Sequence, residues 1–201
     1  MNRLYSTKKG IGAGMVGGIM GGIVMLAPMM SMMPMMNLPS DLFPTLIGTI
    51  MGQAPQYASM TGIGFHFVAS IIIGLIFGTA INSSKLSITS FKKGIGLGIA
   101  TGAIAFAALF LPMMMTVFPP AMMNLMTMMN PGASKEMIMN QLQSMQPMIL
   151  SGSIISHLIY GAVLGAITSL IVINWKLICS KCGMKMSRSE FDSHRGICKV
   201  K

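Results

Sequence analysis

Four residues near the C-terminus have the types and spacing of a metal site. They form the pattern C-x2-C-x11-H-x3-C and are Cys179, Cys182, His194 and Cys198. Thiolate and imidazole groups at this spacing are usual ligands of tetrahedral zinc, and a site closed by four protein ligands leaves no position for a catalytic water. The pattern therefore predicts a structural zinc ion. The alternative is a basic tail without a metal.

The same tail resembles a CCHC variant of the ββα zinc finger. Met186 and Phe191 stand where that finger places its two core side chains, and Ser187 and Glu190 have the spacing of a capping box. A segment this short cannot bury a core alone, so zinc would supply its folding energy. One finger reads only about three base pairs, so nucleic acid is not the expected partner. We expect the tail to contact a cytoplasmic protein or lipid headgroups.

Methionine provides the second candidate chemistry. Of the 26 methionines, nine lie in residues 25–60 and twelve in residues 113–148. Thioethers are soft ligands that suit Cu(I), and unlike thiols they are not lost as disulfides in an oxidising compartment. The candidate ligands are Met29, Met30, Met32, Met33, Met35, Met36, Met122, Met126 and Met129. We expect the first six on an extended segment with three residues per turn, and the last three on one helix face.

An apolar role for these methionines stays open, because methionine is flexible and fills irregular surfaces. Ser40-Asp41 and Ser134 are expected to start two short helices that lie flat at the membrane interface, the first with Leu42, Leu46 and Ile50 on one face. On such helices the methionines would contact lipid or a partner protein.

A membrane bundle is expected to position both groups of residues. The chain has 201 residues, of which 53% are hydrophobic and 9% charged, whereas a soluble domain has about 25% charged residues. Four charge-free stretches are long enough for a membrane span, which needs about 20 residues. The expected spans are residues 10–30, 62–81, 94–114 and 152–175. We therefore predict an all-α membrane protein with four transmembrane helices.

The basic residues predict the orientation of this bundle. Thirteen of the 14 lysines and arginines precede the first span, separate the second from the third or follow the fourth, and only Lys135 lies on the other side. By the positive-inside rule, both termini of this multi-pass protein are expected in the cytoplasm, with the bundle in the cell membrane. The net charge of +10 is then explained by topology and by contact with anionic lipids of the bilayer.

An internal repeat organises the spans. KKGIGAGMVGG at residue 8 returns as KKGIGLGIATG at residue 92, and FHFVASIIIG at residue 65 is echoed by SHLIYGAVLG at residue 156. Residues 1–91 and 92–175 are therefore predicted to form two parallel repeated hairpins, followed by the zinc-binding tail at 176–201. Glycines recur every four residues, which would let the helix backbones approach closely.

His66 and His157 stand at matching places in this echo, one turn below the methionine-rich segments. Two interpretations are open. Each imidazole forms an interhelical hydrogen bond to a backbone or hydroxyl group, or the two form a pseudo-symmetric pair that lines a metal, proton or substrate path.

The stretch GAGMVGGIMGGIVMLAPM, with SHLIYGAVLGA later in the chain, resembles the YagU-like multi-pass inner-membrane proteins. The first repeat departs from that pattern, with Ala69 and Ser70 where the second has Tyr160 and Gly161. The resemblance implies a helical membrane protein with no catalytic motif.

Enzyme chemistry is not expected. The chain has no Ser-His-Asp arrangement, phosphate loop, dinucleotide fingerprint or carboxylate pair, and only four acidic residues. Two functions remain open: a membrane metal-handling protein that binds Cu(I), or an accessory protein whose methionine-rich loops pack against a membrane complex or lipid. So thin a bundle is also expected to form homo-oligomers.

Overall fold

The computed structural model describes residues 7–173, 177–178 and 185–186, and the chain between 7 and 173 is mostly helical. The elements are α1 (Thr7–Met32), the 3-10 turn η1 (Pro34–Met36), α2 (Leu42–Ile50), α3 (Pro55–Ala80), α4 (Phe91–Ala105), the π-helical turn η2 (Phe106–Phe110), α5 (Leu111–Thr116), α6 (Phe118–Met129) and α7 (Lys135–Ile173). Two short strands, β1 (Leu177–Ile178) and β2 (Lys185–Met186), pair antiparallel. The prediction of an all-α bundle is confirmed.

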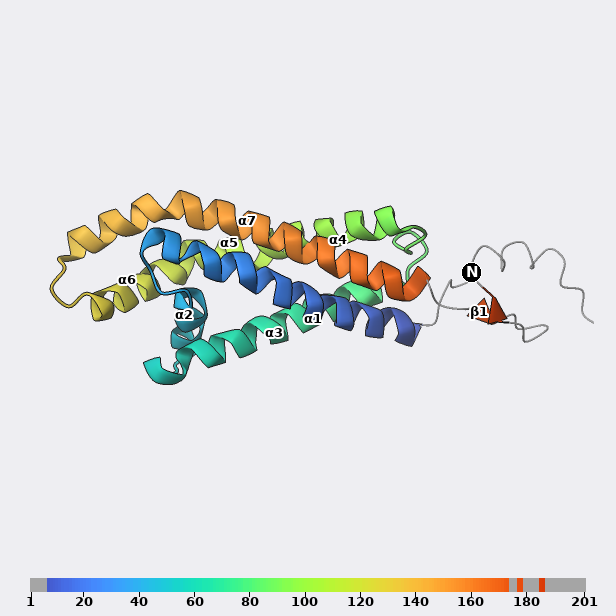
Figure 1. The fold of residues 1–201 in the computed structure, drawn as a ribbon, viewed down its shortest axis with the longest axis horizontal. Helices are drawn as coiled ribbons and strands as arrows, with labels where there is room; N and C mark the ends of the chain where they lie inside the picture. The colour runs from blue at the N-terminus through green and yellow to red at the C-terminus, as the bar shows by residue number, and fades with distance from the viewer. Residues whose placement is uncertain (1–6, 174–176, 179–184, 187–201) are drawn as a thin grey trace, which may run out of the picture.

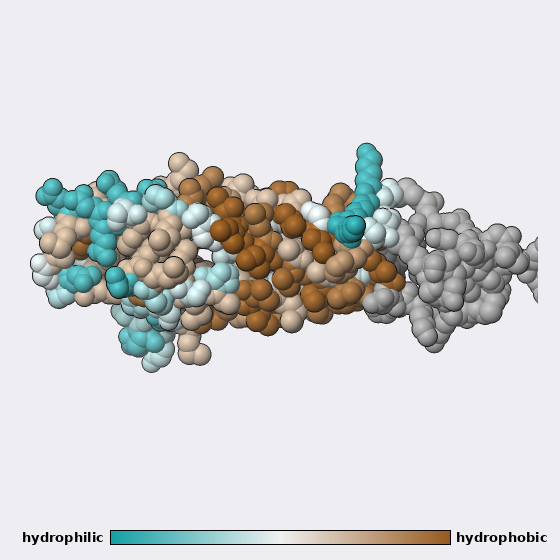
Figure 2. All heavy atoms as spheres, turned by 45° about the horizontal axis from the view of Figure 1, so that its top comes forward, coloured by the Kyte–Doolittle hydropathy of each residue, from teal (hydrophilic) through white to brown (hydrophobic). Residues whose placement is uncertain are grey.

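Four segments are long and apolar enough to cross a membrane. They are Thr7–Met36, Pro55–Ala80, Phe91–Thr116 and Lys135–Ile173. On the face drawn in Figure 2, strongly hydrophobic residues form a broad band, with more hydrophilic surface at the end formed by α6 and the start of α7. Four helices long and apolar enough to span a membrane are therefore present, as predicted.

The spans are arranged as a row rather than a closed ring (Figure 1). α1 packs against both α3 and α7, and α4 packs against the other side of α7, whereas α3 and α4 barely touch. η1, α2, α6 and the first half of α7 gather at one end, which we call the methionine-rich end. The start of α1, the connection from α3 to α4 and the end of α7 form the opposite, basic end.

Glycines bring the helix backbones of each hairpin into direct contact. A Cβ on Gly14 of α1 would overlap the carbonyl of Gly74 in α3. In the same way, a Cβ on Gly98 of α4 would overlap the carbonyl of Gly161 in α7. Close backbone approach is a main source of helix association in lipid. The predicted small-residue faces are confirmed.

The fourth span is much longer than predicted. α7 runs without a break from Lys135, so the prediction of a separate interfacial helix after Ser134 is wrong. Ser134 does cap the helix, because its hydroxyl accepts a bond from the Met137 amide at 3.1 Å. At 1.5 Å per residue α7 is about 58 Å long, nearly twice the hydrocarbon thickness of about 30 Å. Its first half extends beyond the apolar band and packs against α6.

The first methionine-rich segment is helical, so the prediction of an extended segment is wrong. α1 continues through Pro28 to Met32, and Pro34 begins a 3-10 turn. Asn37 then reverses the chain with a positive φ of 58°. The turn buries Met33 completely, which a fully solvated extended segment would not allow. α2 begins at Leu42 as predicted, with Leu42 and Leu46 buried.

Candidate metal-binding cavity

Both histidines line one cavity of about 160 Å³, lined mostly by residues of α1, α3 and α7, which we call the inner cavity. Helix α3 contributes His66 and Ser70 to its wall, and α7 contributes His157 and Tyr160. Phe43 from α2 lines it at the methionine-rich end.

Each imidazole is fixed by a hydrogen bond to a backbone carbonyl. His66 donates through Nε2 to the Gly22 carbonyl at 3.0 Å, and His157 donates through Nδ1 to the Ser153 carbonyl at 2.7 Å. A carbonyl can only accept, so the bonded nitrogen carries the proton. In a neutral ring the other nitrogen then keeps its lone pair. Metal-binding histidines are typically oriented by this kind of bond.

His66 makes the predicted hydrogen bond between helices, from α3 to α1, whereas the bond of His157 stays within α7, so the prediction is wrong for His157. Neither bond excludes ligand binding. Nδ1 of His66 and Nε2 of His157 are the atoms left for a ligand.

Three methionines of α1 line the same cavity. Met25, Met29 and Met32 follow each other at spacings of four and three residues, which places them on one face of the helix. Met32 fills the space that Gly152 of α7 leaves by lacking a side chain, because a Cβ there would overlap its sulfur. Met113 of α5 adds a fourth thioether to the lining. The cavity therefore combines two imidazoles with four thioethers, a ligand set that suits Cu(I).

The two histidines are not a symmetric pair. Gly18 of α1 lies against the carbonyl of Ser70, whereas its repeat partner Gly102 of α4 lies against the carbonyl of His157. His157 therefore matches Ser70 in the packing, and His66 lies one helical turn closer to the methionine-rich end. One turn is about 5.4 Å along the helix. The prediction of a pseudo-symmetric pair is therefore wrong, because the two histidines are offset by one helical turn. Their imidazoles lie at different depths along the bundle, with His66 nearer the methionine-rich end.

Aromatic rings enclose His157. The rings of Phe106 and Phe110 each lie 5.5 Å from its imidazole, and they stack on each other at 5.6 Å between centroids. Both phenylalanines belong to the π-helical turn η2 that follows α4. Such turns are rare and occur often at functional sites. Here the turn presents two rings to one side chain of the cavity.

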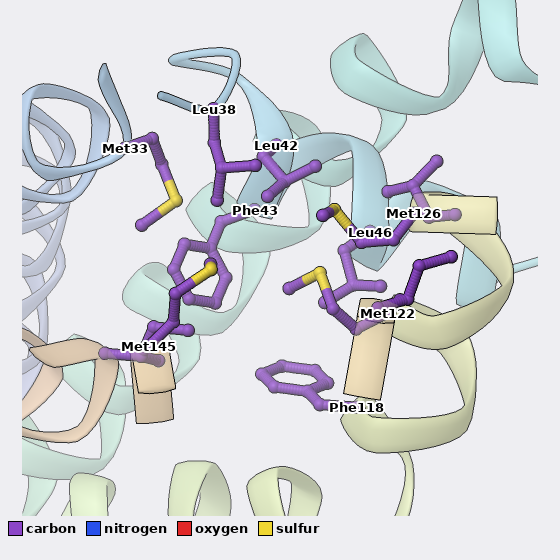
Figure 3. Packing of buried hydrophobic residues seen from close by; sticks show 12 residues of the cluster. Met33, Leu38, Leu42, Phe43, Leu46, Phe118, Met122, Met126 and Met145 are labelled. Carbon is purple, nitrogen blue, oxygen red and sulfur yellow. The ribbon is translucent and has the colours of Figure 1, made fainter. Parts of the chain in front are cut away.

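The other candidate methionines do not join this cavity. Met33, Met122 and Met126 are buried in an apolar cluster at the methionine-rich end, together with Leu42 and Phe43 (Figure 3). The side chains of Met30 and Met36 are half-buried, while those of Met35 and Met129 are exposed. Met122 and Met126 share a helix face as predicted, but Met129 does not share their burial. The structure therefore unites Met29, Met32, His66 and His157 only.

Several cavity residues were not predicted from the sequence. Met25 was recognisable, because it completes a helical pattern with Met29 and Met32. Tyr160 is almost fully buried, and its hydroxyl donates to the Ser70 carbonyl at 2.9 Å. That hydrogen bond links α7 to α3 beside the cavity, and no local sequence pattern predicts it.

The predicted zinc ligands Cys179, Cys182, His194 and Cys198 lie outside the described residues. Among the residues that are described, no three His, Cys, Asp or Glu side chains gather into a metal site. Methionine is not one of those four residue types, so this finding does not apply to the methionine ligands proposed for the inner cavity.

Comparisons with protein-family models, with curated proteins and with solved structures find no match. The resemblance to YagU-like proteins stays a prediction.

Proposed function

We propose that this chain is a multi-pass protein of the cell membrane that binds Cu(I) in metal handling. Both termini lie in the cytoplasm, as the distribution of basic residues favours. The methionine-rich end then lies outside, where thioethers are better suited than thiols to hold Cu(I).

One observation carries this proposal: the histidines and the methionine face of α1 meet in the inner cavity. His66 and His157 have their tautomers set by backbone carbonyls, and Met25, Met29 and Met32 add soft sulfur ligands. Thioethers and neutral imidazoles carry no negative charge to offset the charge of a bound cation. The site therefore favours a soft monovalent cation over a hard divalent one.

Changing Met25, Met29 and Met32 together to leucine is expected to remove copper binding. Leucine preserves apolar volume but supplies no ligand. Protein purified in detergent is loaded anaerobically with Cu(I), dialysed and analysed for metal, with about one copper per wild-type chain expected. The triple variant keeps Met113 as its one cavity thioether and should hold almost none.

The matched control changes Met33, Met126 and Met145 to leucine. These methionines are also buried, but they lie in the apolar cluster and line no part of the inner cavity. This variant should bind copper like the wild type. Equal copper in both triple variants and the wild type would contradict the proposed site.

The cytoplasmic tail is proposed to hold a structural zinc ion through Cys179, Cys182, His194 and Cys198. The pairing of β1 with β2 supports this, because Leu177 lies opposite Met186 and the two strands flank the first two cysteines. A strand pair around C-x2-C is the local structure expected of a ββα finger. We propose that the tail docks to a cytoplasmic protein.

Changing Cys182 to serine is expected to abolish zinc binding and leave copper binding in place. The wild type should contain about one zinc per chain. Lys181→Ser is the matched control, because it changes a neighbouring residue that is not a zinc ligand type. Metal analysis of the same preparations measures both ions. Full zinc content in the Cys182 variant would refute the proposed ligand set.

An accessory role in a membrane complex is the second candidate. It is favoured by the exposure of Met35, Met60 and Met115, whose side chains are 74–80% exposed. Exposed methionines are adaptable contacts for a partner or for lipid. Co-purification of a stoichiometric partner by a chain without copper would favour this role.

A further inference from the structure

A second cavity of about 180 Å³ lies at the methionine-rich end, and we call it the outer cavity. Its lining contains four thioethers and two amides, from Met114, Met122, Met123, Met139, Gln143 and Gln146. Met139, Gln143 and Gln146 are exposed, and the two amides make this rim of the outer cavity polar.

The outer and inner cavities share two lining residues, Phe43 of α2 and Phe118 of α6. Their ring centroids are 6.3 Å apart, with the planes tilted by 53°. Figure 3 shows both rings within the apolar cluster, facing the space between α2 and α6. The two rings therefore form a partition between adjoining cavities.

The aromatic contacts continue from this partition to the inner histidine. Phe118 meets Phe110 edge-on at 5.7 Å, and Phe110 lies 5.5 Å from the His157 ring. Movement of the Phe118 ring would thus displace Phe110, which contacts the His157 ring.

The other side of the inner cavity is unsuited to ion entry. Away from the methionine-rich end, its exposed lining side chains are those of Ala69 in α3 and Leu109 in η2. Both lie in segments apolar enough to span the membrane, so this side of the cavity faces lipid. A bare cation crossing that surface would pay a large desolvation cost.

We propose that the outer cavity is the entry site for Cu(I), and that the ion passes between Phe43 and Phe118 to reach the inner cavity. This rests on the proposed function, since it concerns the route to the same site. The transfer is a ligand exchange: outer thioethers are replaced by inner thioethers and imidazole nitrogens. Copper stays Cu(I), and no electron or proton is transferred.

Loading kinetics test the route. Full-length protein in lipid nanodiscs is mixed anaerobically with Cu(I) carried by bathocuproine disulfonate, a coloured, water-soluble chelator, and loss of colour reports uptake. The variant with Met114, Met122, Met123 and Met139 changed to leucine should load at least about tenfold more slowly than the wild type. Its final copper content should be unchanged, which also shows that the inner cavity is intact.

The matched control changes four exposed methionines of the same end that line neither cavity. They are Met128, Met129, Met137 and Met148. This control should load at the wild-type rate. Phe118→Leu, which keeps an apolar side chain but removes the ring, should load faster than the wild type.

Wild-type loading rates in both the outer-cavity variant and Phe118→Leu would overturn the entry route. That result differs from failure of the proposed function, in which the wild type itself takes up no copper dependent on Met25, Met29 and Met32. Slower copper loading in the exposed-methionine control as well would show that methionines across the surface capture Cu(I). That result would also overturn the proposed route.

Discussion

Replacing Gly98 by leucine is expected to prevent assembly of the second hairpin. A Cβ at this position would overlap the backbone carbonyl of Gly161, and backbone cannot move aside as a side chain tip can. Helices α4 and α7 would have to separate along their contact. We expect a loss of more than about 3 kcal/mol of stability, at or above the upper range for overpacked cores.

Gly96 offers the matched control on the same helix. A Cβ on Gly96 would meet no atom within 4 Å. Gly96→Leu should therefore melt at or near the wild-type temperature in detergent, while Gly98→Leu should be unfolded or recovered in low yield. The first hairpin gives an independent pair, because Gly14 contacts α3 and Gly12 contacts nothing within 4 Å. Equal melting temperatures for Gly96→Leu and Gly98→Leu would refute the packing.

The glycine pairs also explain why the sequence predicts the helix contacts but not their register. Glycine every four residues identifies the face that packs, since such a face follows directly from helical periodicity. Register depends on which backbone carbonyl each glycine meets. Aligning the repeats by their histidines places His66 opposite His157, whereas the packing places His66 level with Ser153. Similar residues in a repeat do not have to occupy similar depths.

The length of α7 and the placement of individual methionines depend on tertiary contacts, which sequence patterns do not contain. Nothing local distinguishes an interfacial helix after Ser134 from the first half of α7, and the continuous helix is supported by packing against α6. Met33 and Met32 are neighbours in a repetitive segment, yet one enters the apolar cluster and the other meets Gly152. Residue type predicted soft-metal chemistry here, while the helical face determined which thioethers reach the cavity.

Changing both His66 and His157 to leucine is expected to weaken Cu(I) binding at the inner cavity by more than about 100-fold. Loss of a single residue that orients a metal ligand already costs about 10- to 100-fold, and this variant removes two proposed ligands. The four thioethers of the cavity would remain, so residual weak binding is expected. Competition with a chelator of known Cu(I) affinity measures the change. An unchanged Cu(I) affinity in the double variant would show that the histidines are not ligands and serve only in hydrogen bonding.

Nitrogen NMR of histidine-labelled protein separates ligation from a structural role. The carbonyls of Gly22 and Ser153 hold the protons on Nε2 of His66 and Nδ1 of His157. Cu(I) is diamagnetic, so its binding should shift the opposite nitrogens, Nδ1 of His66 and Nε2 of His157, and leave the protonated ones little changed. Shifts at the same nitrogens in the Met25, Met29 and Met32 leucine variant would show binding without thioethers. An unshifted spectrum in copper-loaded wild type would exclude both imidazoles as ligands, because a coordinated nitrogen cannot keep its free lone pair.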